Sequence, residues 1–184
     1  MDVRRVVTGH DASGKSVFVS DDSVAPVEPL LMPAYAFHLL WGGDTTPQFP
    51  DDGSMPEWRA YYPPVGGFRF GLFSLAPDTV AAPSEVNVEA GLADVEAKLP
   101  GLLHYVHRGD PGMHTTDTID FEVVLEGTIV LELDDGAEVT LRPGDTVVQN
   151  GTRHRWRNPG DTTARIAVFF CGAAHADVPP IQSQ

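Results

Sequence analysis

The feature that most constrains the fold is a succession of short apolar runs from residue 117 onward, separated by turn sequences. The runs "TIDFEVVL", "TIVLEL", "AEVTL", "TVVQ" and "ARIAVFF" are rich in β-branched and aromatic residues. Between them stand Glu126-Gly127, "DDG", "RPGD" and "NPGD", which are typical of tight turns. Short strands with a turn signal every ten residues or so predict an antiparallel sandwich or a small barrel.

The region upstream of this run is more mixed. Residues 66–77, "GGFRFGLFSLAP", predict a further strand. Over residues 88–99 the apolar side chains recur at helical spacing, and Pro100-Gly101 follow, so we expect one helix there. Residues 21–65 are rich in Pro, Gly and Asp and predict an irregular arm with one strand near "YAFHLLW", residues 35–41.

The stretch "GHDASGKS", Gly9–Ser16, matches the phosphate-loop pattern G-x-x-x-x-G-K-[ST]. A phosphate loop requires a helix directly after the lysine, inside a parallel α/β sheet. The residues that follow are Val17-Phe18-Val19-Ser20, which favour a strand. We therefore predict that Gly9–Ser16 is the loop of a hairpin between runs 3–8 and 16–20, and that no nucleotide cofactor binds.

Composition restricts the partners. Twelve Lys and Arg against 26 Asp and Glu give a net charge of −14, which repels nucleic acid and anionic lipid. No apolar run approaches the ~18 residues that span a membrane, and no apolar segment follows the first charges, so we expect no secretory signal. The single cysteine, Cys171, is expected to be a small buried hydrophobe. The sequence predicts a soluble, cytoplasmic protein without nucleic-acid or membrane partners.

The segment from residue 114 to 125 has two unlike faces if it is extended, because side chains alternate along a strand. Asp117, Ile119, Phe121, Val123 and Leu125 share one face, which we expect to pack against a hydrophobic layer. The other face carries an imidazole and two carboxyl groups, in the order His114, Thr116, Thr118, Asp120, Glu122 and Val124. Such groups are costly to bury unless they are hydrogen-bonded or bind a cation, so a barrel with this face inward is expected to hold a ligand cavity.

A second imidazole, His154, lies in "GTRHRWRN", residues 151–158, just after a glycine turn. Two histidines and a carboxylate from separate strands could form the facial triad typical of Fe(II), Mn or Zn sites. The purely structural alternatives are that His114 lies on an exposed loop, that His154 is a hydrogen-bonded residue at the mouth of the barrel, and that Trp156 only packs. Arginines at 153, 155 and 157 should face away from His154, as solvated edge charges or, in the sharper interpretation, as an anchor for a carboxylate.

These two segments resemble the two motifs of the cupins, which are small β-barrel proteins. The first cupin motif is G-x5-H-x-H-x3,4-E-x6-G. Here Asp120, which is followed by six residues and then Gly127, takes the place of the glutamate. Thr116 stands where the second histidine belongs, and His114 lies two residues earlier.

The second cupin motif is G-x5-P-x-G-x2-H-x3-N. Gly151, His154 and Asn158 match its last part, and Asn150 stands in the proline region with the spacing one residue shorter than usual. The resemblance covers residues 66–171. It implies an all-β, single-domain cupin barrel (a double-stranded β-helix, or jelly roll). The irregular N-terminal arm over 1–65 and the helix near 88–106 are additions to that barrel, and we expect a C-terminal tail over 172–184.

The resemblance implies a metal-dependent enzyme that acts on a small organic molecule, such as an aromatic or polyketide-like compound. His114, Asp120 and His154 would hold a divalent metal, with Fe(II) favoured over Mn or Zn and dioxygenase-type oxidation favoured. Glu122 is the candidate for proton transfer, with His154 as a second catalytic residue. Thr116 and Trp156 are candidate substrate contacts.

Three alternatives remain open at this point. A Zn or Mn cupin would carry out decarboxylation, cyclisation or isomerisation. A metal-free lyase or epimerase would use His114 or His154 as the base, oriented by Asp120. A non-catalytic barrel would only bind a small molecule.

The remaining histidines and the quaternary structure are less constrained. His104 and His107 are usable ligands in principle, but we expect them on a solvated face near the end of the helix. His10, His38 and His175 have no evident partners in the sequence. Cupins often form dimers by exchanging N-terminal strands, so the resemblance implies a homodimer in which the 1–65 arm contacts the second copy.

Overall fold

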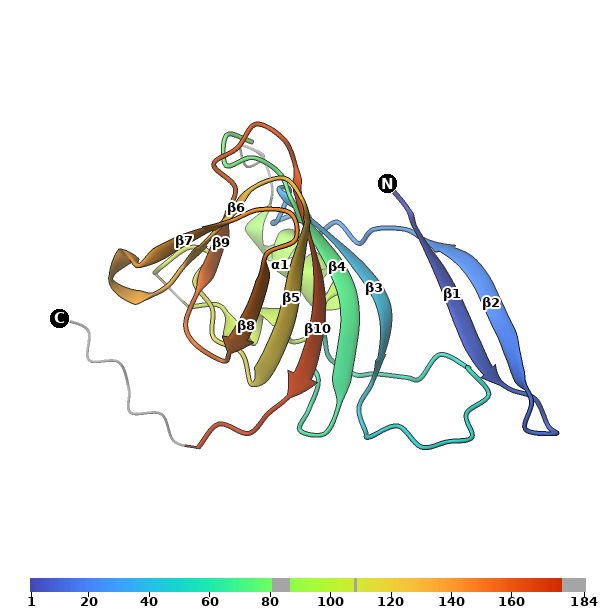
Figure 1. Cartoon of the computed structure of the whole chain (residues 1–184). Coiled ribbons are helices and arrows are strands. Elements are labelled where there is room, and N and C mark those ends of the chain that lie inside the picture. The colour runs from blue at the N-terminus through green and yellow to red at the C-terminus, as the bar shows by residue number, and fades with distance from the viewer. Residues whose placement is uncertain (81–86, 108, 177–184) are drawn as a thin grey trace.

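The computed structural model describes residues 1–80, 87–107 and 109–176, and strands dominate them (Figure 1). The strands are β1 Val3–His10, β2 Ser16–Val24, β3 Tyr35–Gly43, β4 Phe68–Leu75, β5 Thr118–Glu126, β6 Ile129–Glu132, β7 Glu138–Leu141, β8 Thr146–Asn150, β9 Arg155–Arg157 and β10 Ala164–Gly172. The helices of this part of the chain are α1 Val88–Lys98 and the 3-10 turns η1 Leu102–Tyr105 and η2 Asp134–Gly136.

Two antiparallel sheets face each other and form the barrel. The larger has the strand order β3-β4-β10-β5-β8, and the smaller has the order β7-β6-β9. Every strand and turn expected downstream of residue 117 is present at its predicted place, because each is specified by local alternation and by its own turn residues. The strand expected within 66–77 is β4. The predicted all-β barrel is confirmed.

The core lies between the two sheets. Along β10 the residues Ala164, Ile166, Val168 and Phe170 are buried, while the residues between them are more exposed. They meet Ile129 and Leu131 of β6, the aromatic residues of β3 and β4, and helix α1 in one apolar cluster. Burial of these side chains supplies the main stabilisation of the barrel.

The predicted helix is confirmed as α1, but only its C-terminal half meets the core. Asn87 caps the helix, since its side chain accepts a hydrogen bond from the Ala90 amide. Val95 and Leu99 are fully buried, whereas Val88 and Leu92 are 63% and 45% exposed. The expected apolar stripe is therefore buried at one end only, because α1 lies on the outside of the barrel.

The N-terminal segment forms the predicted hairpin. Strands β1 and β2 make a separate two-stranded sheet, which stands apart from the barrel at the right of Figure 1. In the loop, the Asp11 carboxylate accepts hydrogen bonds from the amides of Ser13 and Lys15. The amides that a phosphate loop would offer to a phosphate are thus turned onto a side chain of the same loop.

The segments on either side of the predicted barrel, the arm before it and the tail after it, differ in how they join the sheets. The strand expected near residues 35–41 is β3, which pairs with β4 and so belongs to the large sheet although it precedes residue 66. Strand β10 ends at Gly172, and residues 177–184 of the predicted tail lie outside the described residues. Cys171 is half-buried, not enclosed as predicted. No helix within the described ranges is long and apolar enough to cross a membrane.

Candidate functional site

Strand β5 places its carboxyl groups inside the barrel. Asp120 and Glu122 are 2% and 4% exposed, and Thr118 and Val124 on the same face are equally buried. The face therefore points inward, as its polar composition predicted. The opposite face does not pack against a layer of this chain: Phe121, Val123 and Leu125 are all about two-fifths exposed, at 46%, 39% and 43%. The expected hydrophobic cover is absent from the described part of the chain.

The two predicted histidines lie side by side. His114 and His154 form an isolated β-bridge, in which each amide donates to the carbonyl of the other at 2.9 Å. Their ring centroids are 4.2 Å apart, with an angle of 49° between the rings. Sequence spacing alone does not dictate this pairing, which arises because the segment before β5 runs antiparallel to the segment before β9.

Both imidazoles are held in one tautomer by the backbone. His114 Nδ1 donates to the Gly112 carbonyl at 3.0 Å, and His154 Nδ1 donates to the Thr152 carbonyl at 2.8 Å. A carbonyl only accepts hydrogen bonds, so the proton of each neutral ring resides on Nδ1 and the lone pair on Nε2. This arrangement, with one ring nitrogen anchored to a carbonyl, is the usual one for histidines that bind a metal through the other nitrogen.

The rings and the carboxyl groups open onto one cavity of about 400 Å³. Its polar wall is formed by His114, His154, Asp120 and Glu122. The rest of the lining is almost entirely apolar or aromatic, with residues from the 31–37 segment, β4, α1, η1 and β10. A cavity of this size and composition is typical of sites for small organic ligands.

Two tyrosines in the cavity were missed by the sequence analysis. Tyr61 and Tyr62 belong to the irregular arm, yet their rings pack against each other and against Phe170 of β10. Burial is the main cause that raises the pKa of each phenol, and the nearby carboxyl groups of Asp120 and Glu122 raise it further. Both hydroxyls therefore stay protonated. No local pattern in 44–67 marks these residues, since their place depends on contacts distant in sequence.

Burial also alters the titration of the polar wall. It raises the pKa of Asp120 to about 7, and it raises the pKa of Glu122 well above its ordinary value, with the neighbouring Asp120 as a second cause. One oxygen of each group, Oδ1 of Asp120 and Oε2 of Glu122, is buried and has no hydrogen-bond partner among the described residues. A buried acceptor without a partner is rare, so these oxygens are suited to bind a proton, a cation or a substrate group.

The pKa values of the two histidines shift in the opposite direction. Burial lowers the pKa of His154 to about 3, with the adjacent His114 ring as a second cause, and burial likewise lowers the pKa of His114. Both rings are uncharged at neutral pH. At neutral pH the polar wall thus combines two neutral imidazoles, which accept protons or bind metals, with one carboxyl group that retains its proton, Glu122, and one that is about half protonated, Asp120.

The structure brings together most of the predicted site residues. Trp156 lines the cavity, with its ring 6.2 Å from that of His154 and 6.1 Å from Phe73. Thr116 is 1% exposed and accepts a hydrogen bond from the Thr118 hydroxyl, and it is not among the residues that line the cavity. Within residues 1–80, 87–107 and 109–176, no three His, Cys, Asp or Glu side chains are grouped so that they could hold a metal ion as they stand.

The other histidines lie elsewhere. His104 is exposed, and His107 bonds to the Thr115 hydroxyl at 2.8 Å. His10 and His38 bond to the backbone carbonyls of Asp51 and Met1, at 3.0 and 2.8 Å. His175 pairs with Asp117 on the face of β5 that points away from the cavity.

Comparison with known proteins agrees with the barrel and its two motifs. The family model described as "Cupin domain" matches residues 101–170, which include both histidines and both carboxyl groups of the polar wall. The phomopsin biosynthesis cluster protein C′ of Diaporthe leptostromiformis is 33% identical over 165 residues, which cover 90% of this chain and 75% of that protein. The chain belongs to the cupin superfamily.

Other similar proteins are also cupins. The cupin-domain-containing oxidoreductase fogC of Aspergillus ruber is 26% identical over 156 residues, which cover 85% of this chain and 64% of that protein. A cupin-superfamily sugar phosphate isomerase from Silicibacter pomeroyi is 16% identical, with a TM-score of 0.44 over 80% of this chain and 71% of that one. This cupin therefore spans three quarters of one relative and less than two thirds of the other.

Proposed function

We propose that this cupin is an enzyme of the oxidoreductase class that acts on a small, largely apolar or aromatic compound, with a divalent metal bound by His114 and His154. The observation that carries the proposal is the geometry of the two imidazoles. Both are neutral, both have Nδ1 anchored to a carbonyl, and both line the cavity. The relative fogC, named as a cupin-domain-containing oxidoreductase, supports the reaction class.

The donor chemistry of the polar wall fits a divalent transition metal, with two ligands in position. Neutral imidazole nitrogens bind Fe(II), Mn and Zn, and a carboxyl oxygen without a protein partner, such as Asp120 Oδ1, is a suitable third donor. Asp120 is shorter than the glutamate of the cupin motif and is not grouped with both rings as it lies. When bound, Fe(II), which we favour over Mn or Zn, would pass electrons from the substrate to O2, so that in a dioxygenase-type oxidation the substrate is the species oxidised.

The residues of the chain would perform the remaining tasks. The aromatic lining, including Tyr62, Phe73 and Trp156, would hold a flat apolar substrate and exclude water. Glu122, which keeps its proton because it is buried, would donate that proton to a substrate oxygen and take it back later. His154 would take part as a metal ligand, because its Nδ1 is bonded to the Thr152 carbonyl and its Nε2 is the atom that remains for binding. Thr116 would not contact the substrate. It would instead support Thr118, from whose hydroxyl it accepts a hydrogen bond.

A second candidate function is acid–base catalysis without a metal. It is favoured by the pairing of a protonated carboxyl group, that of Glu122, with unprotonated imidazoles. In this case an imidazole Nε2 would accept a proton from the substrate and Glu122 would donate one at another position. That combination catalyses isomerisation, cyclisation or elimination.

Metal analysis separates the two candidates. Purified protein is reconstituted without oxygen with Fe(II), Mn(II) or Zn(II), desalted, and compared with His154→Ala and with Arg157→Gln, a surface control. The metal-dependent proposal predicts near-stoichiometric metal in the native protein and in the control, and little in His154→Ala. Metal below about a tenth of an equivalent in native protein would rule it out.

Turnover and ligand binding then discriminate further. Oxygen uptake with small aromatic compounds, dependent on Fe(II), supports oxidation. Turnover that survives a chelator and shows a bell-shaped pH–rate profile supports the acid–base candidate. Compounds that raise the unfolding temperature without any turnover would show a non-catalytic binding barrel.

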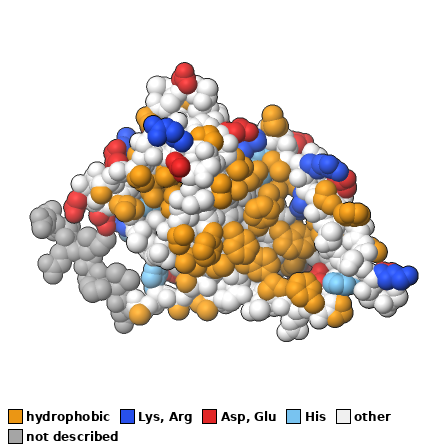
Figure 2. All heavy atoms as spheres, in the orientation of Figure 1, with side chains coloured by type: hydrophobic (Ala, Val, Ile, Leu, Met, Phe, Trp, Pro, Cys, Tyr) orange, Lys and Arg blue, Asp and Glu red, His pale blue; other side chains and the backbone are white. Residues whose placement is uncertain are grey.

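We also propose that this cupin is a homodimer. The outer face of the large sheet carries an apolar patch, visible in orange across the front of Figure 2. Phe70, Phe169, Phe121 and Val148 are opposite one another on successive strands, and all are more than a third exposed. Contiguous apolar surface of this kind marks interaction sites.

A second copy is the proposed occupant of the patch because the hairpin also leaves apolar side chains uncovered. Phe18 is 81% exposed, and Val6 and Val19 are 46% and 42% exposed, although an isolated two-stranded hairpin is marginal in water. Gel filtration with light scattering should give twice the chain mass of 19.9 kDa. A monomer at micromolar concentration would contradict the proposal. The cytoplasmic location and the lack of nucleic-acid, membrane and nucleotide partners remain predictions.

A further inference from the structure

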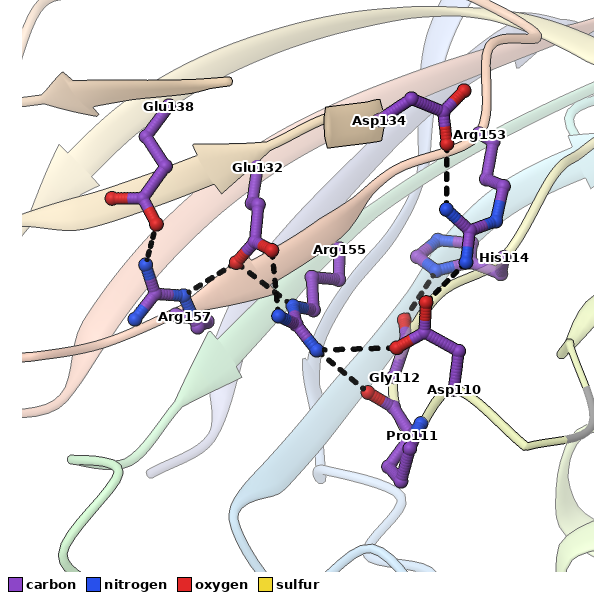
Figure 3. A network of polar contacts seen from close by, with 10 residues as sticks. All are labelled: Asp110, Pro111, Gly112, His114, Glu132, Asp134, Glu138, Arg153, Arg155 and Arg157. Atoms are coloured by element: carbon purple, nitrogen blue, oxygen red, sulfur yellow. Dashed lines mark hydrogen bonds and ion pairs between the residues drawn. The ribbon is translucent and has the colours of Figure 1, made fainter. Parts of the chain in front are cut away.

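A ladder of ion pairs lies on the side of β9 that faces away from the cavity (Figure 3). Arg155 forms a bidentate ion pair with Glu132, in which Nε donates to Oε2 at 2.9 Å and Nη2 donates to Oε1 at 2.6 Å. Arg157 contacts Glu132 at 2.9 Å and also pairs with Glu138. The arginines thus face acids of β6 and β7, and they are not the solvated edge charges that the sequence suggested.

The ladder continues onto the loop that carries His114. Asp110 pairs with Arg153 and, at 3.4 Å, with Arg155. These two arginines flank His154 in the chain. Arg155 also donates to the Pro111 carbonyl at 3.4 Å, and Arg153 is fixed from behind by Asp134 at 2.6 Å. One carboxylate therefore ties the His114 loop to the residues on both sides of His154.

The loop held in this way orients the His114 ring. The Met113 amide donates to the Asp110 carbonyl at 3.1 Å, which closes a tight turn over residues 110–113. Gly112 sits in this turn with a φ of 84°, a conformation that favours glycine, and its carbonyl accepts the hydrogen bond from His114 Nδ1 at 3.0 Å. The position of the Gly112 carbonyl decides which ring nitrogen keeps the proton.

We propose that Asp110 is a positioning residue for His114: held by Arg153 and Arg155, it fixes the turn that presents the Gly112 carbonyl to His114 Nδ1. It thereby sets the tautomer of His114 and its distance from His154. Isolated surface ion pairs contribute little to stability. This carboxylate instead joins two arginines that are already held by Glu132 and Asp134, so its role is orientation more than stability.

The catalytic importance of this role rests on the function proposed for His114. The role itself can be tested on protein without metal or substrate. The variant Asp110→Asn removes the charge with almost no change of shape. The matched control is Glu138→Gln, the same change of chemistry on the same ladder, where the partner is Arg157 and the His114 loop is not touched. Long-range proton–nitrogen NMR spectra report which nitrogen of each imidazole carries the proton.

In the native protein and in Glu138→Gln, we expect His114 to carry its proton on Nδ1. In Asp110→Asn, we expect a mixture with the Nε2–H tautomer, while His154 keeps its proton on Nδ1. Hydrogen exchange of the His114 amide, which donates to the His154 carbonyl, should become about tenfold faster in Asp110→Asn only, because the opening is local. The unfolding temperature should match that of the control.

The opposite results are equally clear. A His114 tautomer and amide exchange rate that stay native in Asp110→Asn would overturn the proposal, as would equal changes in Asp110→Asn and Glu138→Gln. If Asp110→Asn does not fold, the pair Arg153→Gln and Arg157→Gln makes the same comparison from the other side. Only Arg153→Gln should release His114, and a native His114 tautomer in that variant would contradict the role of Asp110. Metal or substrate binding does not enter either readout, so these results are independent of the proposed function.

Discussion

The two faces of β5 show a reversal of the usual pattern in a sheet. Asp120 and Glu122 point into the barrel and are almost fully enclosed, whereas Phe121 and Val123, which alternate with them, point outward and are about two-fifths exposed. A strand with one wet face normally buries its apolar side and exposes its polar side. The reversal means that neither face has the usual packing: the inner one lines a cavity, and the outer one leaves apolar side chains exposed, as the proposed dimer requires.

The cavity site, to which the inner face of β5 contributes, should respond most strongly to loss of an imidazole. His154→Ala is expected to weaken binding of Zn(II) or Fe(II) by more than about 100-fold, since loss of a mere outer-shell partner costs 10–100-fold. Competition with a chromophoric chelator measures this change. The outer-face variant Phe121→Ser is the control and should bind metal like the native protein. Equal affinity of His154→Ala and native protein would remove His154 from the ligand set.

The enclosed carboxyl group gives a prediction for stability against pH. The pKa of Asp120 is raised on folding to about 7, so its proton is bound more tightly in the folded state. The associated stability is complete below about pH 4 and is lost as the pH rises through 7. Asp120→Asn, which cannot ionise, should therefore be more stable than native protein at pH 8, by roughly 2–4 kcal/mol.

Urea unfolding of metal-free protein at pH 5 and pH 8 measures this difference. At pH 5 the folded native carboxyl is protonated, so the advantage of Asp120→Asn should be clearly smaller than at pH 8. An advantage that is the same at both pH values would show that Asp120 is ionised in the folded state. Chelator treatment is essential, because a bound cation would lower the pKa of the same carboxyl.

A substitution on the outer face of β5 and its neighbours should change the dissociation constant of the dimer and leave the cavity site unchanged. Phe169→Asp places a charge in the middle of the apolar patch, where it would be buried between two copies. We expect the dimer to dissociate at least about tenfold more readily, the effect of roughly 1.4 kcal/mol. Analytical ultracentrifugation measures the constant. An unchanged dimer would move the contact to another surface, and Val88→Asp on the exposed end of α1 is the matched control.

The smallest expected effect is that of Val123→Ala on the outer face of β5, judged against its neighbour Val124. Val124 is 2% exposed and belongs to the core, whereas Val123 is 39% exposed. In dilute, dissociated protein, Val124→Ala should cost about 2 kcal/mol of unfolding free energy, and Val123→Ala less than about 0.5 kcal/mol. Chemical denaturation distinguishes them. Similar costs for both would mean that the outer face is covered within the monomer.

The same comparison shows how far the sequence predicts the structure. Strands β5 to β8 and β10, with their turns, were predictable because each is specified by local alternation and by Gly, Asp and Pro at the turns. Alternation also placed Asp120 and Glu122 inside. It could not show that Phe121 lacks a cover, because a strand pattern distinguishes two faces without stating what lies against either.

Contacts between distant segments account for what was missed. Tyr61 and Tyr62 reach the cavity from an irregular arm through packing on Phe170, with no periodic signal of their own. Asp110 lies 43 residues from Arg153, and nothing in the spacing pairs them. The two histidines were predicted to converge, but only the structure shows that a β-bridge joins them directly.

The central claim is that His114 and His154 offer their Nε2 atoms to one ion at the cavity wall. Proton NMR of the protein reconstituted with Co(II) tests it most directly, because a paramagnetic ion shifts the exchangeable Nδ1–H signals of the rings it binds. The account predicts two such signals, one lost in His114→Ala and the other in His154→Ala. No shifted signals, or signals that persist in both variants, would contradict it.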